Sequence, residues 1–516
     1  MAHDANGSHA SLDEAQVQLA IDEHEQRALP MLNTLWTCYR NPSTLAGHGG
    51  GGGGGVAGGG GGSGARRLRQ ALEAGLPRRV RSADAHGNPR EIVIENDIAW
   101  RIHTMVDFVA GKPMAIRSQA AGEVREELDE FFASLIEHSG GMAMLQDASL
   151  LAHVFGYVDF IVRADVAAMR ARGGSGGRGG SGGRGRLREV ADLIRIEPID
   201  PRRGVAMLDP SDYRAVRGYV IRAGANGRED AAADGFLSRS GSLVERLAEA
   251  LSKRRKERET PEYVEVVTRE ASVLRVNGRV TRSASNAWAG GRVPIVHVQN
   301  VAQPFAYAGL SDVEPLLPLV DELNTRLSDR ANRVALQSFK MYLAKGIDGF
   351  EKAPIAPGMV WSTNNPDASI QAFGGDAEAP SEATHITEIR EALDKVSGVP
   401  PLASGVVRAK LGNLTSATAL RITLMGLIAR TQRKRLLLGR GIAEICGLAL
   451  AAVEHAGLIE LSNADRQVRV EWPDPVPVET LQSEAAGTGE AAGPSEAGAG
   501  ASTSEGPAAS GAPSGE

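Results

Sequence analysis

Two short stretches have the spelling Gly-x-Ser-x-Gly, which in some hydrolases presents a nucleophilic serine. They are centred on Ser175 and Ser181. A nucleophilic serine of this kind sits on a sharp turn between a strand and a helix. Both stretches instead lie in a run of glycine, serine and arginine over 172–188. We therefore predict a flexible insertion there and no catalytic serine.

The same insertion contains RGG-like units around Arg178 and Arg184. In other proteins such segments contact RNA. An RGG-type RNA-binding protein therefore stays open as an alternative function, although a flexible loop explains the composition without RNA.

A second glycine-rich stretch covers Gly47–Gly64. A phosphate-binding loop needs a strand before it and a Gly-Lys-Ser/Thr ending, and this stretch has neither. Nearly pure glycine can neither bury apolar surface nor hold one conformation. We interpret the stretch as a linker.

Residues that bind metals or cofactors do not form a recognisable pattern. The eleven histidines are scattered singly, and the two cysteines, Cys38 and Cys446, are far apart. These cysteines suit a reducing compartment and form no disulfide framework. We expect no catalytic residue, no cofactor and no metal. A cryptic hydrolase remains an alternative, because paired carboxylates need no motif.

The bulk properties describe a soluble intracellular chain of two or three domains. The chain has 516 residues and a formal charge of −6, which excludes a globally basic nucleic-acid binder. The N-terminus lacks the pattern of a secretory signal. The longest uncharged apolar run, Ile445–Val453, is too short to span a bilayer. The basic run Lys253–Arg258 is typical of a solvated helix face.

Two long amphipathic segments dominate the second half. The first, 314–345, has apolar residues at helical spacing, and the packing residues we predict are Leu316, Val320, Leu323, Leu327 and Val334. The second, 415–457, would be about 60 Å long if unbroken. Gly439 and Gly441 lie in its middle, where we expect a bend. Helices this long favour a scaffold for an assembly.

The segments around these helices are shorter. Residues 346–380 read as a small β-containing excursion, and Ser381 is the predicted N-cap of a helix over 381–397. A loop follows at 398–414. Gln467–Trp472 alternates as a strand, and 481–516 is a disordered acidic tail.

The first half reads as helices followed by strands. Helices are predicted over 12–40, 96–111, 123–138, 142–155 and 244–259, and strands over 91–94, 157–163, 193–196, 219–221, 263–268, 273–280 and 294–298. Asn277-Gly278 is a strong hairpin-turn signal. Tyr157–Arg163 alternates like a strand.

Several of these segments, in this order, resemble the portal proteins of tailed bacteriophages, especially the SPP1-like and HK97-like types. The matching segments are Asn96–Pro113, Val293–Val296, Gly309–Asp312, Leu319–Asn324 with Ser328 and Asn332, Gly398–Pro401, Thr415–Leu420 and Val470–Pro477. Together they extend over about 90–480. Each is weak alone, so the resemblance depends on their common order.

The resemblance implies an α+β, portal-type fold and a ring oligomer, usually of twelve subunits. It implies long stem and wing helices, a small β-containing clip and a mixed α/β wing. The implied divisions are 1–46 (N-terminal helical segment), 47–64 (linker), 65–313 (wing, with a disordered insert at 172–188), 314–345 (stem), 346–380 (clip), 381–397 (stem), 398–414 (tunnel loop), 415–457 (long kinked helix), 458–480 (wing strand) and 481–516 (acidic tail).

The resemblance also implies a function and its partners. The ring would sit at one capsid vertex as the channel for double-stranded DNA during packaging and ejection. Its partners would be the large terminase subunit, the head–tail adaptor, the major capsid protein and a scaffolding protein, with no membrane. The chain would be in the virion, and in the host cytoplasm during assembly. Clip docking is expected at Gly349, Phe350 and Trp361, and the tunnel loop would present Val406, Val407, Arg408, Lys410 and Leu411.

The overall charge fits passage of DNA better than capture. Each phosphate contact adds affinity and salt dependence, so a channel should make few of them. The chain is mildly acidic, and its predicted tunnel loop has two basic residues, Arg408 and Lys410. A helical structural or assembly protein without a DNA channel remains the other alternative.

Overall fold

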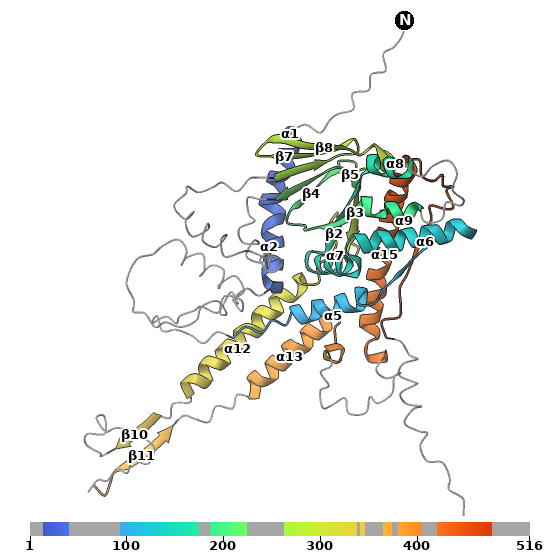
Figure 1. Cartoon of the computed structure of the whole chain (residues 1–516). Coiled ribbons are helices and arrows are strands. Elements are labelled where there is room, and N and C mark those ends of the chain that lie inside the picture. The colour runs from blue at the N-terminus through green and yellow to red at the C-terminus, as the bar shows by residue number, and fades with distance from the viewer. Residues whose placement is uncertain are drawn as a thin grey trace, which may run out of the picture.

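The computed structural model describes residues 14–40, 93–174, 186–223, 263–337, 341–345, 365–373, 380–404 and 421–476. They form a mixed α+β fold, as predicted (Figure 1). The helices are α1 (Glu14–Glu23), α2 (Leu29–Arg40), α5 (Ala99–Ala110), α6 (Gly122–His138), α7 (Gly141–Phe155), α8 (Val166–Gly174), α9 (Arg186–Val190), α12 (Leu317–Gln337), α13 (Pro380–Ser397) and α15 (Met425–His455).

The strands make four antiparallel sheets. Two are pairs, β1–β12 and β10–β11, one has the order β3-β2-β9, and one has the order β4-β5-β6-β7-β8. The bounds are β1 (Ala115–Ser118), β2 (Tyr157–Ala164), β3 (Ile194–Ile199), β4 (Gly204–Asp209), β5 (Asp212–Ala223), β6 (Tyr263–Val267), β7 (Ala271–Val276), β8 (Arg279–Ser285), β9 (Ile295–Gln299), β10 (Met341–Lys345), β11 (Ser369–Phe373) and β12 (Val468–Glu471).

Strand β2 is the centre of the three-stranded sheet and lies where a strand was predicted. Its first six residues are all buried. One face meets the main core with α7 and α15, and Ile161 on the other face packs with Tyr219 of β5. A strand covered on both faces has no solvated side, so alternation in the sequence did not report burial.

The five-stranded sheet contains the predicted hairpin. Asn277 and Gly278 both have positive φ (51° and 77°), as a two-residue type I′ turn requires, and they join β7 to β8. Two strands were not predicted, β1 and β4. The strand predicted at 219–221 is the inner part of the longer β5.

Helix α15 is the core helix of the body, the name used here for the sheets and the helices packed on them. Leu438, Ile442 and Ile445 join the cluster that contains Phe131 and Phe132 of α6. By length and composition alone α15 is long and apolar enough to cross a membrane. However, 56% of its most apolar window is buried inside the protein, as in the core helix of a soluble protein.

The two central glycines of α15 allow close packing. The helix is continuous through both of them, and the bend predicted there remains a prediction. A Cβ on Gly441 would lie 2.2 Å from Val298 Cγ2. Strand β9 can therefore lie this close to the helix only because Gly441 has no side chain.

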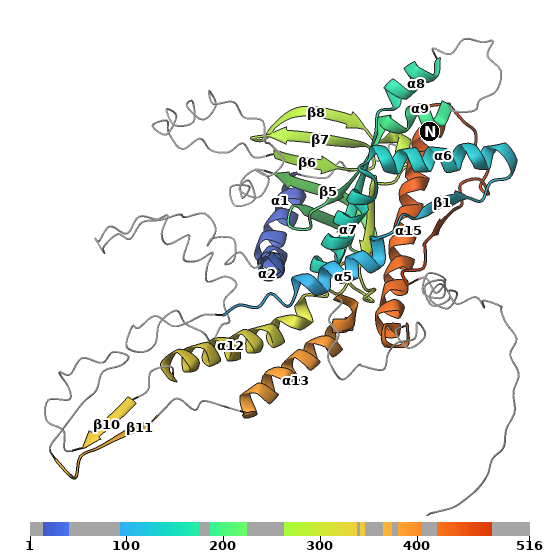
Figure 2. The same ribbon diagram turned by 60° about the horizontal axis from the view of Figure 1, so that its bottom comes forward.

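Helices α12 and α13 run side by side away from the body, and β10 and β11 lie beyond their far ends (Figures 1 and 2). These four elements are called the arm. A helix continuing to residue 345 was predicted, but α12 ends at Gln337 and β10 begins at Met341. Met341-Tyr342-Leu343 pairs with Gln371-Ala372-Phe373, so strand pairing overrides the helical pattern.

Three further predictions were wrong. Val93 and Ile94, predicted in a strand, belong to no sheet, since their segment bonds to side chains of α12. The insertion predicted over 172–188 is helical at both ends, where Leu187 is buried in the core. Helix α13 begins at Pro380, so Ser381 lies inside it; Pro fits the first helical turn because its missing N–H is not needed there.

Helices α5, α6 and α7 were predicted within a few residues of their observed ends, whereas α8 and α9 were not predicted. The helix expected over 12–40 is α1 and α2, joined by a π-helical turn at His24–Ala28. The Gly47–Gly64 linker, the basic helix at 244–259 and the acidic tail lie outside the described residues.

Candidate functional site: the junction between body and arm

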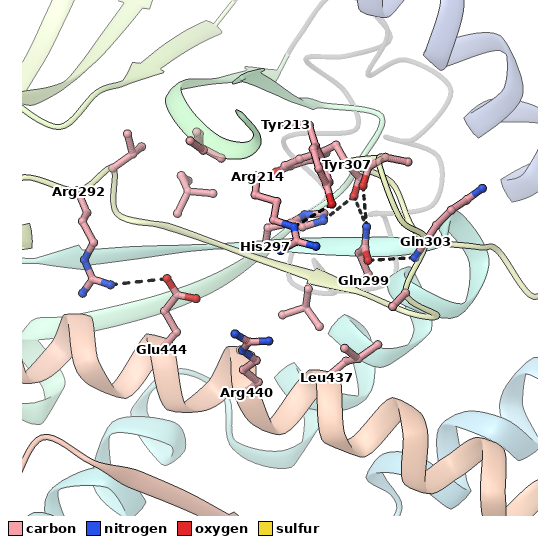
Figure 3. Close-up of a pocket in the computed structure, with 18 of the residues that line it drawn as sticks. Tyr213, Arg214, Arg292, His297, Gln299, Gln303, Tyr307, Leu437, Arg440 and Glu444 are labelled. Carbon is pink, nitrogen blue, oxygen red and sulfur yellow. Dashed lines mark hydrogen bonds and ion pairs between the residues drawn. The ribbon is translucent and has the colours of Figure 1, made fainter. Parts of the chain in front are cut away.

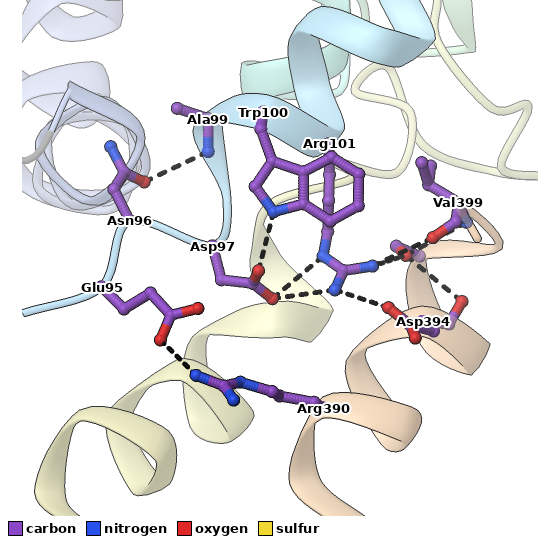
Figure 4. A network of polar contacts seen from close by, with 10 residues as sticks. Glu95, Asn96, Asp97, Ala99, Trp100, Arg101, Arg390, Asp394 and Val399 are labelled. Carbon is purple, nitrogen blue, oxygen red and sulfur yellow. Dashed lines mark hydrogen bonds and ion pairs between the residues drawn. The ribbon is translucent and has the colours of Figure 1, made fainter. Parts of the chain in front are cut away.

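The arm is attached to the body by a buried arginine on α5, Arg101, which is 2% exposed (Figure 4). Nε and Nη2 donate to Asp97 Oδ2 at 3.1 and 2.8 Å, and Nη2 also donates to Asp394 Oδ1 at 2.7 Å. Nη1 donates to Ser397 Oγ (2.9 Å) and to the Val399 carbonyl oxygen (3.1 Å). All five guanidinium N–H groups therefore have an acceptor.

These bonds join three parts of the chain. Asp97 precedes α5, Asp394 and Ser397 end α13, and Val399 lies at the start of the predicted tunnel loop. Trp100 covers the guanidinium, with its ring centroid 4.4 Å from Arg101 Cζ, and donates from Nε1 to Asp97 Oδ1 at 2.7 Å. A planar fork in this arrangement fixes both distance and angle, which a lysine could not do.

The extended segment before α5 is tied to both arm helices. The backbone N–H of Val93 donates to Ser328 Oγ (3.0 Å), and that of Glu95 donates to Asn324 Oδ1 (2.8 Å). The Glu95 carboxylate in turn accepts from Arg390 of α13 at 2.7 Å. The segment is therefore held through polar side chains where a strand was predicted.

A second buried ion pair links the start of the arm to α15. Lys434 donates to Asp312 Oδ2, which also accepts from Asn300 Nδ2 at 2.6 Å. Burial lowers the pKa of Lys434, against the opposing effect of Asp312. Burial by itself would raise the pKa of Asp312, but the charges of Lys434 and His153 and the bonds from Lys434 and Asn300 hold it below its usual value.

The residues beside Asp312 fix the conformation of the chain just before α12. Ser311 Oγ donates to the Val154 carbonyl at 2.6 Å and accepts from the N–H groups of Val313 and Glu314, so it caps the 3₁₀ turn that starts α12. A Cβ on Gly309 would lie 2.5 Å from the Gly156 carbonyl oxygen. Only glycine fits where the two chain segments cross.

Arg435 makes a third attachment, between α15, α5 and the segment after β12. Nε and Nη2 donate to the carbonyls of Val109 (3.1 Å) and Phe108 (2.9 Å), near the C-terminal end of α5. Nη1 donates to the Pro473 carbonyl at 2.6 Å. Burial lowers the pKa of Arg435, against the opposing effect of the Asp474 charge.

Five of the seven sequence segments that resemble portal proteins therefore meet at one place. Arg101, Asp312 and Val399 come from three of them, and each takes part in one of the buried contacts above. Asn324 and Ser328 come from a fourth, and Pro473 from another. The segment Thr415–Leu420 lies outside the described residues. Segments far apart in the sequence thus build one junction, and its buried polar contacts position the arm relative to the body.

A histidine–aspartate pair in the body has the composition of a hydrolytic site but not its geometry. His297 Nδ1 lies 2.6 Å from Asp159 Oδ1, but Nε2 is bonded to the Tyr307 carbonyl oxygen at 2.7 Å. A base that activates a hydroxyl needs that nitrogen. Burial, with the nearby Asp159 charge, raises the pKa of Tyr219 and Tyr307 well above the usual value, so both stay neutral donors to Asp159. The pair stabilises the sheet and the loop after β9.

The predicted arm-packing residues differ in their burial. Leu316 and Leu323 are fully buried in the junction core, and Val320 and Leu327 are partly buried against it. Val334, in contrast, is 51% exposed, because α12 has by then left the body. The docking residues Gly349, Phe350 and Trp361 lie outside the described residues, as do the tunnel-loop residues Val406, Val407, Arg408, Lys410 and Leu411.

The residues that organise the junction were missed by sequence reasoning. Arg101, Lys434 and Arg435 are charged residues within apolar helical patterns, which is the one signal that could have identified them. Within the described ranges, no three His, Cys, Asp or Glu side chains are arranged to hold a metal ion.

The sequence comparison matches part of the chain to a family model. Residues 270–493 match the family described as phage portal protein, SPP1 Gp6-like, which confirms the resemblance. Among solved structures, the chain is similar to one titled "Neck of empty GTA particle computed with C6 symmetry" (13% identity, TM-score 0.42) and to one titled "Virion of native gene transfer agent (GTA) particle" (12% identity, TM-score 0.40). Each alignment covers 77% of this chain and 86% of the other. No curated protein matches.

Proposed function

We propose that this chain is the portal protein of a phage-like particle and forms a closed ring around a DNA channel at one capsid vertex. The observation that carries the proposal is the match of residues 270–493, which extends from β7 through the arm and α15 to β12. The match contains the arm, the Lys434–Asp312 pair and Arg435, whereas Arg101 and Asp97 lie before it.

In the proposed ring, α12 and α13 are the stem and β10–β11 belongs to the clip. The stem points away from the body and is attached at its base by Arg101 (Figure 2). Its charges are mixed, since α12 has three acidic and three basic residues and α13 has four acidic and two basic ones. A stem of this kind has no strong phosphate-binding face, which suits DNA in transit.

The described residues on either side of the proposed tunnel loop are anchored to other parts of the molecule. On one side the Val399 carbonyl accepts from Arg101 (3.1 Å). On the other, Arg421 donates to the Asp474 carboxylate (3.0 Å) and to the Val476 carbonyl (3.2 Å). Fixed ends are what a channel loop needs if it is to act on DNA while the ring stays closed. Arg408 and Lys410 are the proposed transient phosphate contacts.

The partners follow from the same proposal. The clip would bind the large terminase subunit during packaging and then the head–tail adaptor. The outer part of the body would contact the major capsid protein and a scaffolding protein. Twelve copies are proposed, in the host cytoplasm during assembly and in the virion afterwards. No reaction is assigned to the chain.

Electron microscopy of the purified full-length chain tests the proposal. We expect closed rings with a central hole wide enough for a DNA duplex. Monomers alone, across micromolar concentrations and several salt conditions, would overturn it. A compact assembly without a hole would favour the helical structural protein, and RNA that copurifies and is needed for solubility would favour the RNA-binding alternative.

A further inference from the structure

The outward face of α15 carries apolar and basic residues together. Met425 and Leu436 are 64% and 72% exposed, and Arg433 and Arg440 are also exposed. Steps of eight, three and four residues place all four on one side of the helix, over about 22 Å. We call this set the basic stripe. A large apolar side chain between two arginines is typical of a surface that is covered in an assembly.

The basic stripe is a ridge between two hollows. On one side is a cleft of about 800 Å³, lined by α15, β9, the hairpin end of β5 and the loop after β9 (Figure 3). On the other is a hollow of about 700 Å³ between α15 and the segment around β12. Arg440 lines both. Such a surface fits the side-chain ridges of another helix.

The cleft adds positive charge to the ridge. Arg214, Arg269 and Arg292 line it and are exposed, and its one carboxylate, Glu444, lies 3.6 Å from Arg292. Arginines around an apolar ridge favour an acidic helix as the partner. DNA is the less suitable partner, because a phosphate backbone would not bury the exposed apolar side chains of Met425 and Leu436.

The same chain carries a complementary helix elsewhere. On α6 the exposed residues Glu123, Glu126, Glu130 and Glu137 follow one another at steps of three, four and seven, which places them on one face. We call this set the acidic stripe. Helix α6 extends at the side of the molecule in both views (Figures 1 and 2).

The two stripes are associated with opposite edges of the three-stranded sheet. Its order is β3-β2-β9. Helix α6 packs along β3, and Ser139, just after α6, accepts from the Ile196 N–H at 3.2 Å. The cleft is lined by His297 and Gln299 of β9. Two different patches on opposite edges are what a head-to-tail contact requires, since each copy must offer both.

We propose that the acidic stripe of one copy docks on the basic stripe of the next, so that α6 packs across α15 of its neighbour. This inference rests on the proposed ring and names the surface that closes it. Leu436 and Met425 are then buried between copies, and the charges fix the direction of packing. Because the ion pairs lie at an interface rim, high salt weakens the contact.

Charge reversal tests the pairing directly in the full-length chain. We expect Arg433→Glu with Arg440→Glu, and separately Glu126→Arg with Glu130→Arg, each to lower the ring population at least tenfold in mass photometry. The variant with all four substitutions should recover rings, because the complementarity is restored with opposite signs. Arg279→Glu with Arg282→Glu, on the exposed strand β8, is the matched control and should keep wild-type rings.

The failures can be told apart. A wild-type chain without rings overturns the proposed function itself. Rings that persist in both reversed variants, or that the fourfold variant does not recover although its melting temperature is that of the wild type, overturn this pairing alone. Rings that are lost on reversal of the basic stripe and on truncation after Gln482, but persist on reversal of the acidic stripe, would overturn this pairing and assign the basic stripe to the acidic tail.

A crosslinking variant keeps the test independent of charge. Glu130→Cys with Arg440→Cys, in a Cys38→Ser background, places one thiol on each stripe. Burial raises the pKa of the Cys446 thiol to about 12, so that residue stays unreactive. A short bis-maleimide should yield a ladder of linked copies on a denaturing gel. Monomer alone, from a preparation that contains rings, would overturn the pairing.

Discussion

The body and the arm of this molecule are stabilised by different interactions. Around α15 the body packs apolar side chains such as Ile442 and Ile445 on both a sheet and other helices. The arm has a narrower apolar seam near its base, and farther out an ion pair between Arg333 and Glu382 joins its two helices. Their junction is a set of buried charges, among which Arg101 has an acceptor for every guanidinium N–H group. A projecting element can thus be oriented by hydrogen-bond geometry where little apolar area is available.

This difference predicts distinct responses to substitution. Damage to the core of the body should destabilise the whole chain cooperatively. Damage to the junction should release the arm while much of the body keeps its packing. The substitutions below test whether the body and the arm respond separately, and the one with the largest expected effect comes first.

Arg101→Met should have the largest effect. It leaves the carboxylates of Asp97 and Asp394 buried without their cation, which typically costs about 3–5 kcal/mol. Hydrogen exchange should rise in α13 well before it rises in α7. The control is Arg390→Met, which removes a half-exposed pair with Glu95 and should cost about 0–1 kcal/mol. Equal effects of the two variants would contradict the assignment of Arg101 as the attachment point.

Ile442→Ala tests the body. The side chain is fully buried, and the cavity should lower the free energy of unfolding by about 2–5 kcal/mol. We expect chemical denaturation to shift as one cooperative transition, with exchange rising in α6 and β2 together. Gln432→Ala, exposed on the same helix, should change stability by less than about 0.5 kcal/mol. A purely local rise in exchange around Ile442 would show that α15 is not part of one cooperative unit.

A pH effect should come from His153, which is buried beside the Lys434–Asp312 pair. Its Nδ1 donates to the Ser149 carbonyl at 2.6 Å, and burial, with the Lys434 charge, lowers its pKa from 6.5 to about 4. Between these values the unfolded chain binds a proton that the folded chain does not. Stability should therefore fall as the pH drops from 6.5 toward 4.

The size of the effect can be measured with His153→Gln. Between pH 7 and pH 5 the wild type should lose about 2 kcal/mol more stability than the variant. Denaturation midpoints at several pH values supply the comparison. Parallel curves for the two proteins would show that another group sets the acid sensitivity of the junction.

The sequence predicted much of the secondary structure and little of the junction. The Asn277-Gly278 turn and the apolar face of α5 depend on local chemistry, and both were predicted correctly. The end of α12 was not, because β10 depends on pairing with a strand about thirty residues away. Arg101 and Lys434 were missed because their partners lie about 290 and 120 residues away along the chain. Buried polar contacts over such separations leave no periodic pattern.

The smallest predicted effect, about 1 kcal/mol, is at Ser328 on α12. The residue is fully buried, and its hydroxyl accepts the Val93 N–H at 3.0 Å while it can donate to the Asn324 carbonyl at 2.7 Å. Ser328→Ala leaves the Val93 N–H without its acceptor, so exchange should rise over residues 93–96. Thr387→Ala, which removes a hydroxyl bonded within exposed α13, is the matched control and should have no such effect. If Ser328→Ala raised exchange in α15 as strongly as at Val93, the arm and the body would be one cooperative unit, and the distinction between them would have to be abandoned.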